Sequence, residues 1–155
     1  MLIVYDGSGS VCVRIEGPWL HPVVWLFSED AADVRACLRN DRRASVFDTV
    51  VGTAALSCYR LLGVTRITAD LSDSGAMNLA DTWNMLLSAE RVVNAIDCAS
   101  EGDVTRIASE NGGVPDPEAV LAMLRRRATA KPQDVRVHRF ENISLKKSGE
   151  TIWTL

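Results

Sequence analysis

The stretch VFDTVVGTAALSCYRLLG, residues 46–63, decides how the rest of the chain is interpreted. Apolar and small residues surround most of the circumference of a helix drawn through it, which is typical of a helix buried on several sides. Asp48 would cap this helix, and Gly63 would end it, because glycine readily adopts the left-handed conformation found after helices. The sequence therefore predicts a buried helix that begins near Asp48 and carries Gly52 in its first turn.

Gly52 has two interpretations, because glycine is unfavourable inside a helix. The helix could pack so closely against a sheet that a Cβ atom would collide with it. Alternatively, a ligand could approach the first turn. The neighbouring alanines favour packing, since small residues let backbones approach one another.

Further elements follow this helix. VTRITAD, residues 64–70, alternates imperfectly and predicts a strand. The cluster at 72–74 supplies caps for a second helix that ends near residue 87, and RVVNAI, residues 91–96, predicts another strand. A short helix after residue 98 closes at the turn Asn111-Gly112-Gly113. The sequence Asp116-Pro117-Glu118 then begins the last helix.

The two ends of the chain are rich in strand signals. LIVY and VCVRIE, residues 2–5 and 11–16, flank a Gly/Ser/Asp turn and predict a β-hairpin. Ser28 is expected to cap a helix that ends near Asn40. The tail from residue 134 predicts a strand, a turn and a second strand. This order predicts a three-layer α/β/α sandwich with a mixed sheet. Residues 1–130 form its main part, and residues 131–155 a C-terminal β-hairpin extension of the same domain.

Three segments resemble domain-of-unknown-function family 1893, which has a cytidine-deaminase-like fold. They are LIVYDGSGSVCVRIEGPWLHP, FDTVVGTAAL and IASENGGVPDPEAVLAML, within a match that spans residues 2–125. In zinc deaminases of that fold, the starts of two helices carry His or Cys metal ligands and a catalytic Glu. Here the corresponding stretches are 52–55 and 71–76, which contain no His, Cys or Glu. The resemblance therefore implies the deaminase fold without zinc chemistry, and no metal or cofactor is expected.

Composition limits the classes of partner. The net charge is −3 with 24% charged residues, and neither half is strongly basic, so no nucleic-acid partner is expected. The four cysteines are scattered among apolar neighbours, which indicates buried reduced thiols. The sequence predicts neither a signal peptide nor a membrane span, and a cytoplasmic location is the expectation.

The favoured function is a relic deaminase-type pocket that binds a small polar or phosphorylated ligand. Two helix starts would present backbone N–H groups to an anion, although Asp48 and Asp73 would compete for them. The expected ligand-binding residues are Asp48, Gly52, Thr53, Ser72, Asp73, Ser74, Asn111 and Gly112.

A second hypothesis is a homodimeric interaction module with a vestigial pocket. Trp19 and Trp153 lie in a loop and a terminal strand, where they could anchor an interface. An enzyme that uses Asp48, Asp73 or Glu118 as general acid or base is a third possibility, for which the sequence offers no positive support.

Overall fold

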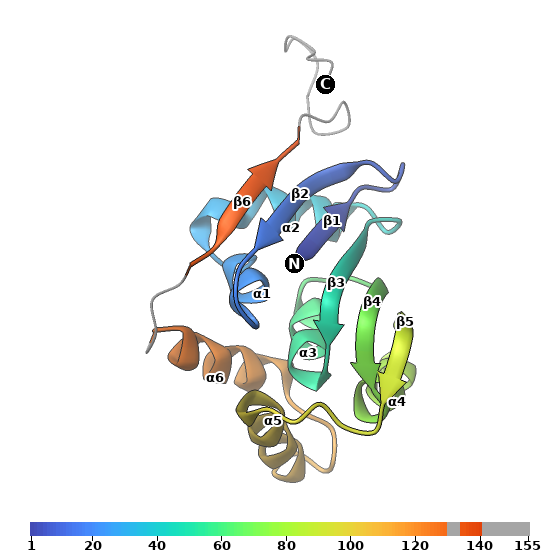
Figure 1. The fold of residues 1–155 in the computed structure, drawn as a ribbon, viewed down its shortest axis with the longest axis vertical. Coiled ribbons are helices and arrows are strands. Elements are labelled where there is room, and N and C mark those ends of the chain that lie inside the picture. The colour runs from blue at the N-terminus through green and yellow to red at the C-terminus, as the bar shows by residue number, and fades with distance from the viewer. Residues whose placement is uncertain (130–133, 141–155) are drawn as a thin grey trace, which may run out of the picture.

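The computed structural model describes residues 1–129 and 134–140, which form a six-stranded sheet flanked by helices (Figure 1). The strands are β1 (Leu2–Tyr5), β2 (Val11–Glu16), β3 (Ser45–Val51), β4 (Arg66–Asp73), β5 (Leu86–Val93) and β6 (Arg136–Arg139). The helices are α1 (His21–Trp25), α2 (Ala32–Asn40), α3 (Thr53–Leu61), α4 (Ser74–Thr82), α5 (Ala99–Ser109) and α6 (Pro117–Thr129), with a 3-10 helix η1 (Glu29–Ala31) before α2. This confirms the α/β sandwich and its N-terminal β-hairpin.

The sheet is mixed, with strand order β5-β4-β3-β1-β2-β6. β3, β4 and β5 are parallel to one another, whereas β1, β2 and β6 pair antiparallel. The parallel strands therefore end at the same edge of the sheet. In Figure 1, the chain that leaves β5 runs along this edge to α5.

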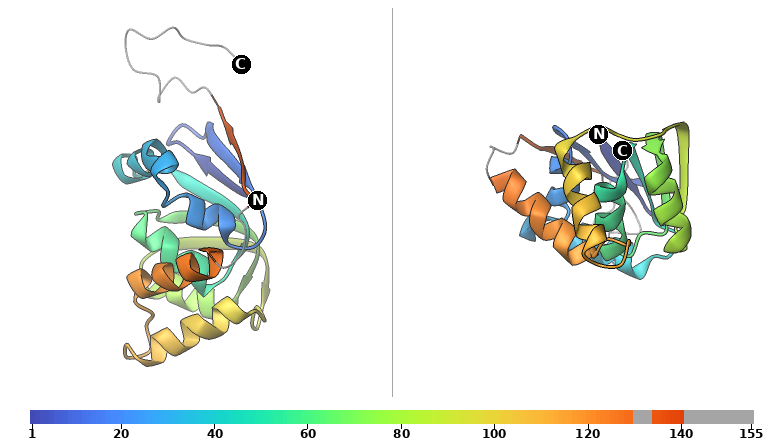
Figure 2. Two further views of the ribbon diagram at one scale, coloured as in Figure 1. Left: turned by 90° about the vertical axis from the view of Figure 1, so that its left-hand side faces the viewer. Right: turned by 90° about the horizontal axis from the view of Figure 1, so that it is seen from below.

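The helices lie on one side of the sheet (Figure 2). β3 and β4 place Val46, Ile67 and Ala69 on this side, where they are buried in the core. The alternating residues Thr68 and Asp70 point to the opposite face and are exposed. Both crossovers, β3-α3-β4 and β4-α4-β5, step in the same direction along the sheet, which places their helices on the same face. The described residues thus supply the sheet and one helical layer of the three layers expected.

The prediction of a helix from Asp48 is wrong for the first part of that stretch. Residues 45–51 form β3, and the helix begins only after Gly52. The β-branched residues of DTVV fit a strand between two neighbours, and an apolar run is compatible with either a buried strand or a buried helix. Gly63 follows the helix with φ 78°, as predicted for its end.

The second helix ends earlier than predicted. α4 stops at Thr82, and Asn84 adopts a left-handed conformation with φ 57°, which reverses the chain. Leu86 and Leu87, expected in the helix, begin β5, and the strand predicted at 91–96 therefore ends at Val93. Ser28 precedes η1, but its side chain makes no capping hydrogen bond.

The first strand of the predicted C-terminal hairpin is present as β6, which pairs antiparallel with β2. Its second strand and Trp153 lie outside the described residues. Within the two described ranges, no helix is long and apolar enough to cross a membrane.

Candidate functional site

Asp48 lies in the middle of β3 and its side chain is buried beside α3. The hydroxyl of Tyr59, on α3, donates a hydrogen bond of 2.6 Å to Asp48 Oδ2. Burial raises the pKa of the Asp48 carboxyl to about 7, and the Tyr59 hydrogen bond opposes that rise. Asp48 is therefore not the helix cap predicted from the sequence. It is a buried carboxyl group that gains and loses its proton near neutral pH.

The start of α3 is capped from a distance by Glu101, the third residue of α5. Glu101 Oε1 accepts hydrogen bonds from the backbone N–H of Thr53, at 2.7 Å, and from its hydroxyl, at 3.0 Å. Glu101 Oε2 accepts a third, from the N–H of Ala54, at 3.1 Å. A negative charge at this end of a helix is also favoured by the helix dipole. Glu101 therefore occupies the position where the sequence predicted an external anion.

Glu101 also accounts for Gly52. A Cβ atom on Gly52 would overlap Glu101 Oε1 and would lie 2.7 Å from the carboxyl carbon. Nonbonded carbon atoms pack at about 3.5–4.0 Å, so the carboxylate could not remain in place. Neither packing against the sheet nor an external ligand is the reason for this glycine, because a side chain of the same molecule fills the space.

The start of α4 has the cap that the sequence predicted. Asp73 Oδ1 accepts the N–H of Ala76 at 2.7 Å, and Asp73 Oδ2 accepts the N–H of Ile96 at 3.1 Å. Ser72 is buried in β4 and donates to the carbonyl of Val51 at 2.7 Å. Ser74 begins α4, where its hydroxyl lies 3.5 Å from the carbonyl of Val93. The side chains of Asp73, Ser72 and Ser74 thus all have protein partners.

A cavity of about 270 Å³ opens beside the start of α3, and we name it the α3 cavity. Asp48, Gly52 and Glu101 line it together with Ala55 of α3. The other lining residues come from the N-terminus, the loop after β2, the end of β3 and the segment that leads from β5 into α5. These further lining residues are Met1, Gly17, Trp19, Leu20, Thr49, Val50, Ile96, Cys98 and Ser100. Of the eight predicted ligand-binding residues, the lining includes two, Asp48 and Gly52.

The other predicted residues lie nearby or elsewhere. Thr53 follows Gly52 and is held by Glu101, as described above. Asn111 and Gly112 form the turn after α5, where Asn111 Nδ2 donates to the carbonyl of Val114 at 3.0 Å and Gly112 has φ 72°. These contacts fit the turn role that the sequence indicated.

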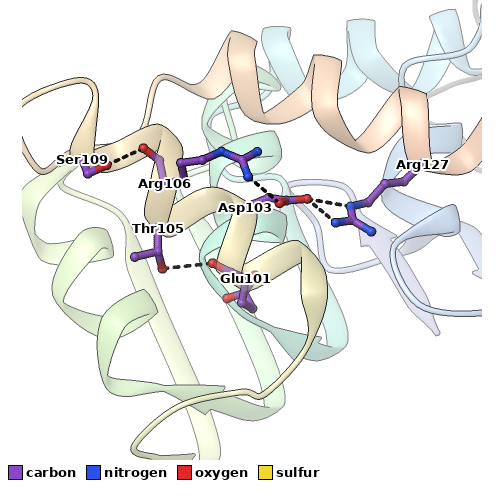
Figure 3. A network of polar contacts seen from close by, with 6 residues as sticks. All are labelled: Glu101, Asp103, Thr105, Arg106, Ser109 and Arg127. Carbon is purple, nitrogen blue, oxygen red and sulfur yellow. Dashed lines mark hydrogen bonds and ion pairs between the residues drawn. The ribbon is translucent and has the colours of Figure 1, made fainter.

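The ion pair between Arg127 and Asp103 holds α5 against α6, and two further contacts lie within α5 (Figure 3). Arg127 Nε donates to Asp103 Oδ2 at 2.8 Å, and Arg106 lies 3.3 Å from Asp103 Oδ1. The hydrogen bond from Arg127 lowers the pKa of Asp103 below its usual value, and both guanidinium charges contribute. Thr105 donates to the carbonyl of Glu101 at 3.0 Å. α5 is thus tied to α6 at Asp103 and to α3 at Glu101.

The four cysteines are free, as predicted, but only Cys12 and Cys58 are buried, whereas Cys37 and Cys98 are half-buried. Burial raises the pKa of the Cys12 and Cys58 thiols to about 12. Across residues 1–129 and 134–140, no three His, Cys, Asp or Glu residues are grouped so that they could hold a metal ion. The absence of zinc chemistry stays a prediction.

Comparison with known proteins supports the fold. No protein-family model matches the chain, and no curated protein matches it. One solved structure that does match is the crystal structure of a DUF1893 family protein from Thermotoga maritima, with a TM-score of 0.54. The two chains share a fold. They are 20% identical, and the alignment covers 81% of this chain and 79% of the other. This agrees with the family that the three sequence segments resemble.

Sequence reasoning missed Glu101, Tyr59, Cys98 and Ser100. Glu101 is 48 residues from Thr53, and no local pattern links the two. Tyr59 offered a weak signal, because a tyrosine in an apolar helix needs a partner for its hydroxyl. Cys98 precedes α5 and Ser100 lies in its first turn, and only the folded chain brings them to the cavity.

Proposed function

We propose that this chain is a DUF1893 protein that binds a small polar molecule in the α3 cavity, without zinc chemistry. The observation that supports this is the placement of a buried carboxyl, Asp48, in the lining of a cavity of about 270 Å³. Ligand sites typically combine apolar walls with a few converging polar groups, and they occur outside the carboxyl ends of parallel strands. Asp48, Ser100 and Glu101 are the polar groups, and Ala55, Leu20 and Trp19 contribute apolar walls.

The polar groups favour a ligand that donates hydrogen bonds. Glu101 already accepts from the N–H groups of Thr53 and Ala54, so these donors are not available to a phosphate. The carboxyl groups of Glu101 and Asp48 also repel an anion when they are ionised. We therefore propose an uncharged or cationic ligand with N–H or O–H groups rather than a phosphorylated one.

Titration followed by amide NMR tests this function with adenosine, cytidine and inorganic phosphate as probes. We expect a nucleoside to shift the amides of residues 48–54, and phosphate to leave them unchanged. Asp48→Asn removes an ionisable acceptor and should weaken nucleoside binding about tenfold or more. Ser74→Ala is the matched control, because Ser74 lies outside the cavity lining, and binding should be unchanged.

Two outcomes contradict the proposal. Shifts with phosphate alone would restore the anion hypothesis, and an absence of shifts with every probe would leave the cavity without a ligand-binding role.

A second candidate function, a homodimeric interaction module, is favoured by the exposed outermost strand β5. β5 is an edge strand, and its Leu86 and Val92 side chains are 67% and 47% exposed. Exposed apolar edge strands pair readily with other chains. We expect light scattering to show a dimer that Leu86→Lys dissociates. His138→Lys, at an exposed residue of β6 at the opposite end of the strand order, is the control and should leave the dimer intact. A monomeric wild-type chain at high concentration would remove this candidate.

A further inference from the structure

Another cavity, of about 270 Å³, lies between α2, the end of α3 and α6, and we name it the arginine cavity. Three arginines line it, Arg35 and Arg39 from α2 and Arg125 from α6, together with one carboxylate, that of Glu118. Its remaining walls are apolar, from Phe27, Leu61, Leu62 and Leu121. None of these residues lines the α3 cavity, so this site is independent of the function proposed above.

Backbone carbonyls of three consecutive residues hold two of the arginines. Arg35 Nη1 donates to the carbonyl of Leu26 at 2.8 Å and to that of Ser28 at 2.5 Å. Arg125 Nη2 donates to the carbonyl of the residue between them, Phe27, at 3.3 Å, and its guanidinium carbon lies 5.8 Å from the centre of the Phe27 ring. Two guanidinium groups are thus positioned in the wall of one cavity, which reduces the entropy that ligand binding would lose in ordering them.

The two arginines of α2 keep donors for a ligand. Among the residues that the structure describes, none accepts a hydrogen bond from Arg35 Nε or Nη2. Neither nitrogen is among the buried polar atoms that lack a partner, so solvent reaches both. Arg39 is exposed and has no hydrogen-bond or ion-pair partner within the described ranges. It follows Arg35 by four residues, which places the two side chains on one face of α2. A ligand in the cavity can therefore reach both.

The charges of the lining favour an anion. Three guanidinium groups are accompanied by the single carboxylate of Glu118, which leaves an excess of positive charge in the wall. Arg127, by contrast, is paired with Asp103. A guanidinium group can donate two parallel hydrogen bonds to a phosphate, and this geometry makes arginine the preferred residue for phosphate recognition. A phosphate monoester carries between one and two negative charges at neutral pH, which complements this excess.

We propose that the arginine cavity binds the phosphate monoester of a small hydroxyl-bearing molecule. The phosphate oxygens accept hydrogen bonds from Arg35 and Arg39, and the charge of Arg125 adds to their attraction. A hydroxyl group of the ligand donates to the Glu118 carboxylate, and its short carbon body contacts the leucine walls. A volume of about 270 Å³ lies just below the usual range for ligand sites, about 300–1,000 Å³, which limits the ligand to a few carbon atoms beyond its phosphate.

The test is an amide NMR titration of the full chain with a matched pair of probes, glycerol 3-phosphate and glycerol, and with inorganic phosphate. We expect glycerol 3-phosphate to bind with one-to-one saturation and to shift the amides of residues 35–39 and 118–125. Glycerol has no phosphate and should leave these amides unchanged. Inorganic phosphate should shift the same amides with an affinity about tenfold lower, because it has no carbon body and no alcohol hydroxyl to donate to Glu118.

Arg39→Gln removes an exposed charged donor, so this variant should fold normally and bind glycerol 3-phosphate about tenfold more weakly. Arg42→Gln is the matched control, because Arg42 is an exposed arginine beyond the end of α2 that does not line the cavity, and binding should be unchanged.

The proposal is overturned if glycerol 3-phosphate causes no saturable shift at these residues, or if glycerol or inorganic phosphate binds equally well. Equal losses of affinity in Arg39→Gln and Arg42→Gln would also overturn it, because they indicate non-specific attraction to positive charge. So would shifts confined to residues 48–54, which assign the phosphate to the α3 cavity. Nucleoside binding in the α3 cavity does not depend on Arg39, so failure here is distinguishable from failure of the proposed function.

Discussion

The starts of α3 and α4 solve the same physical problem in different ways. Each helix follows a parallel strand at the same edge of the sheet, and each begins with backbone N–H groups that need acceptors. At α4 the acceptor is Asp73, three residues before Ala76 in the chain. At α3 the acceptor is Glu101, which comes from another helix. The first solution is local and independent of the rest of the fold, whereas the second requires α5 to be docked.

The two preceding strands differ as well. β4 ends in the aspartate that caps its helix, while β3 carries its aspartate, Asp48, at a buried position where Tyr59 is the side-chain partner. The same residue type therefore stabilises one helix start and creates a titratable group beside the other. Four experiments test this difference between the two helix starts.

The largest effect should come from pH, through Asp48. The folded chain holds the Asp48 proton up to about pH 7, whereas the unfolded chain releases it near pH 3.8. The free energy of unfolding should therefore fall as pH rises from about 4 to about 7. The shift is about three pH units, which corresponds to about 4 kcal/mol at about 1.4 kcal/mol per unit. Asp48→Asn has no proton to lose, so urea unfolding across this range should show a shallower decline. Equal pH dependence in the two proteins would contradict a buried, proton-bearing Asp48.

Gly52→Ala should have the next largest effect. The added Cβ atom displaces the flexible Glu101 side chain, and the N–H groups of Thr53 and Ala54 lose their acceptor, so we expect a destabilisation of about 2 kcal/mol. Gly75→Ala at the start of α4 is the matched control. There a Cβ atom would meet Asp73 Oδ1 at 3.5 Å and Thr53 Cγ2 at 3.7 Å, which are ordinary contacts. Alanine favours the helix, so this variant should be neutral or slightly more stable in thermal unfolding. Similar losses of stability in Gly52→Ala and Gly75→Ala would show that the starts of α3 and α4 do not differ.

Asp73→Ala should cost about 1–2 kcal/mol, because it removes the cap of α4 and leaves the N–H groups of Ala76 and Ile96 without their acceptor. Asp73→Asn is the comparison, since its amide oxygen can still accept the N–H of Ala76 whereas its NH₂ group cannot accept the N–H of Ile96. Chemical unfolding should show a loss of stability smaller than that of Asp73→Ala. A loss as large as that of Asp73→Ala would mean that the hydrogen bond to Ala76 does not stabilise the start of α4.

The smallest effect is a coupling of about 1 kcal/mol between Gly52 and Glu101. Glu101→Ala removes the group with which the new Cβ atom would clash, so Gly52→Ala should be less costly in that background. The four proteins of this double-mutant cycle are compared by urea unfolding. Additive losses would show that something other than Glu101 restricts Gly52.

Most of the correct predictions depended on residues that lie close together in the sequence. The hairpin, the cap at Asp73, the end at Gly63 and the Pro117 start each depend on residues close together in the chain, and each is present. The strand at residues 45–51 was missed because a buried strand and a buried helix share an apolar composition. The cap by Glu101 was missed for a different reason, because no periodicity or motif connects residues 53 and 101. The α3 cavity depends on that contact, so only its Asp48 and Gly52 were among the predicted site residues.

The hydrogen bonds from Thr53 and Ala54 to Glu101 also bear on the order in which parts of the chain open. Amide hydrogen exchange reports openings of different size, from frayed ends to whole cooperative units. The amide of Ala76 is released when its own first turn frays, because Asp73 lies beside it. The amides of Thr53 and Ala54 are released whenever α5 undocks, even while the turn that contains them stays folded. Amide exchange at the start of α3 thus reports the undocking of α5, a helix that begins nearly fifty residues later in the chain.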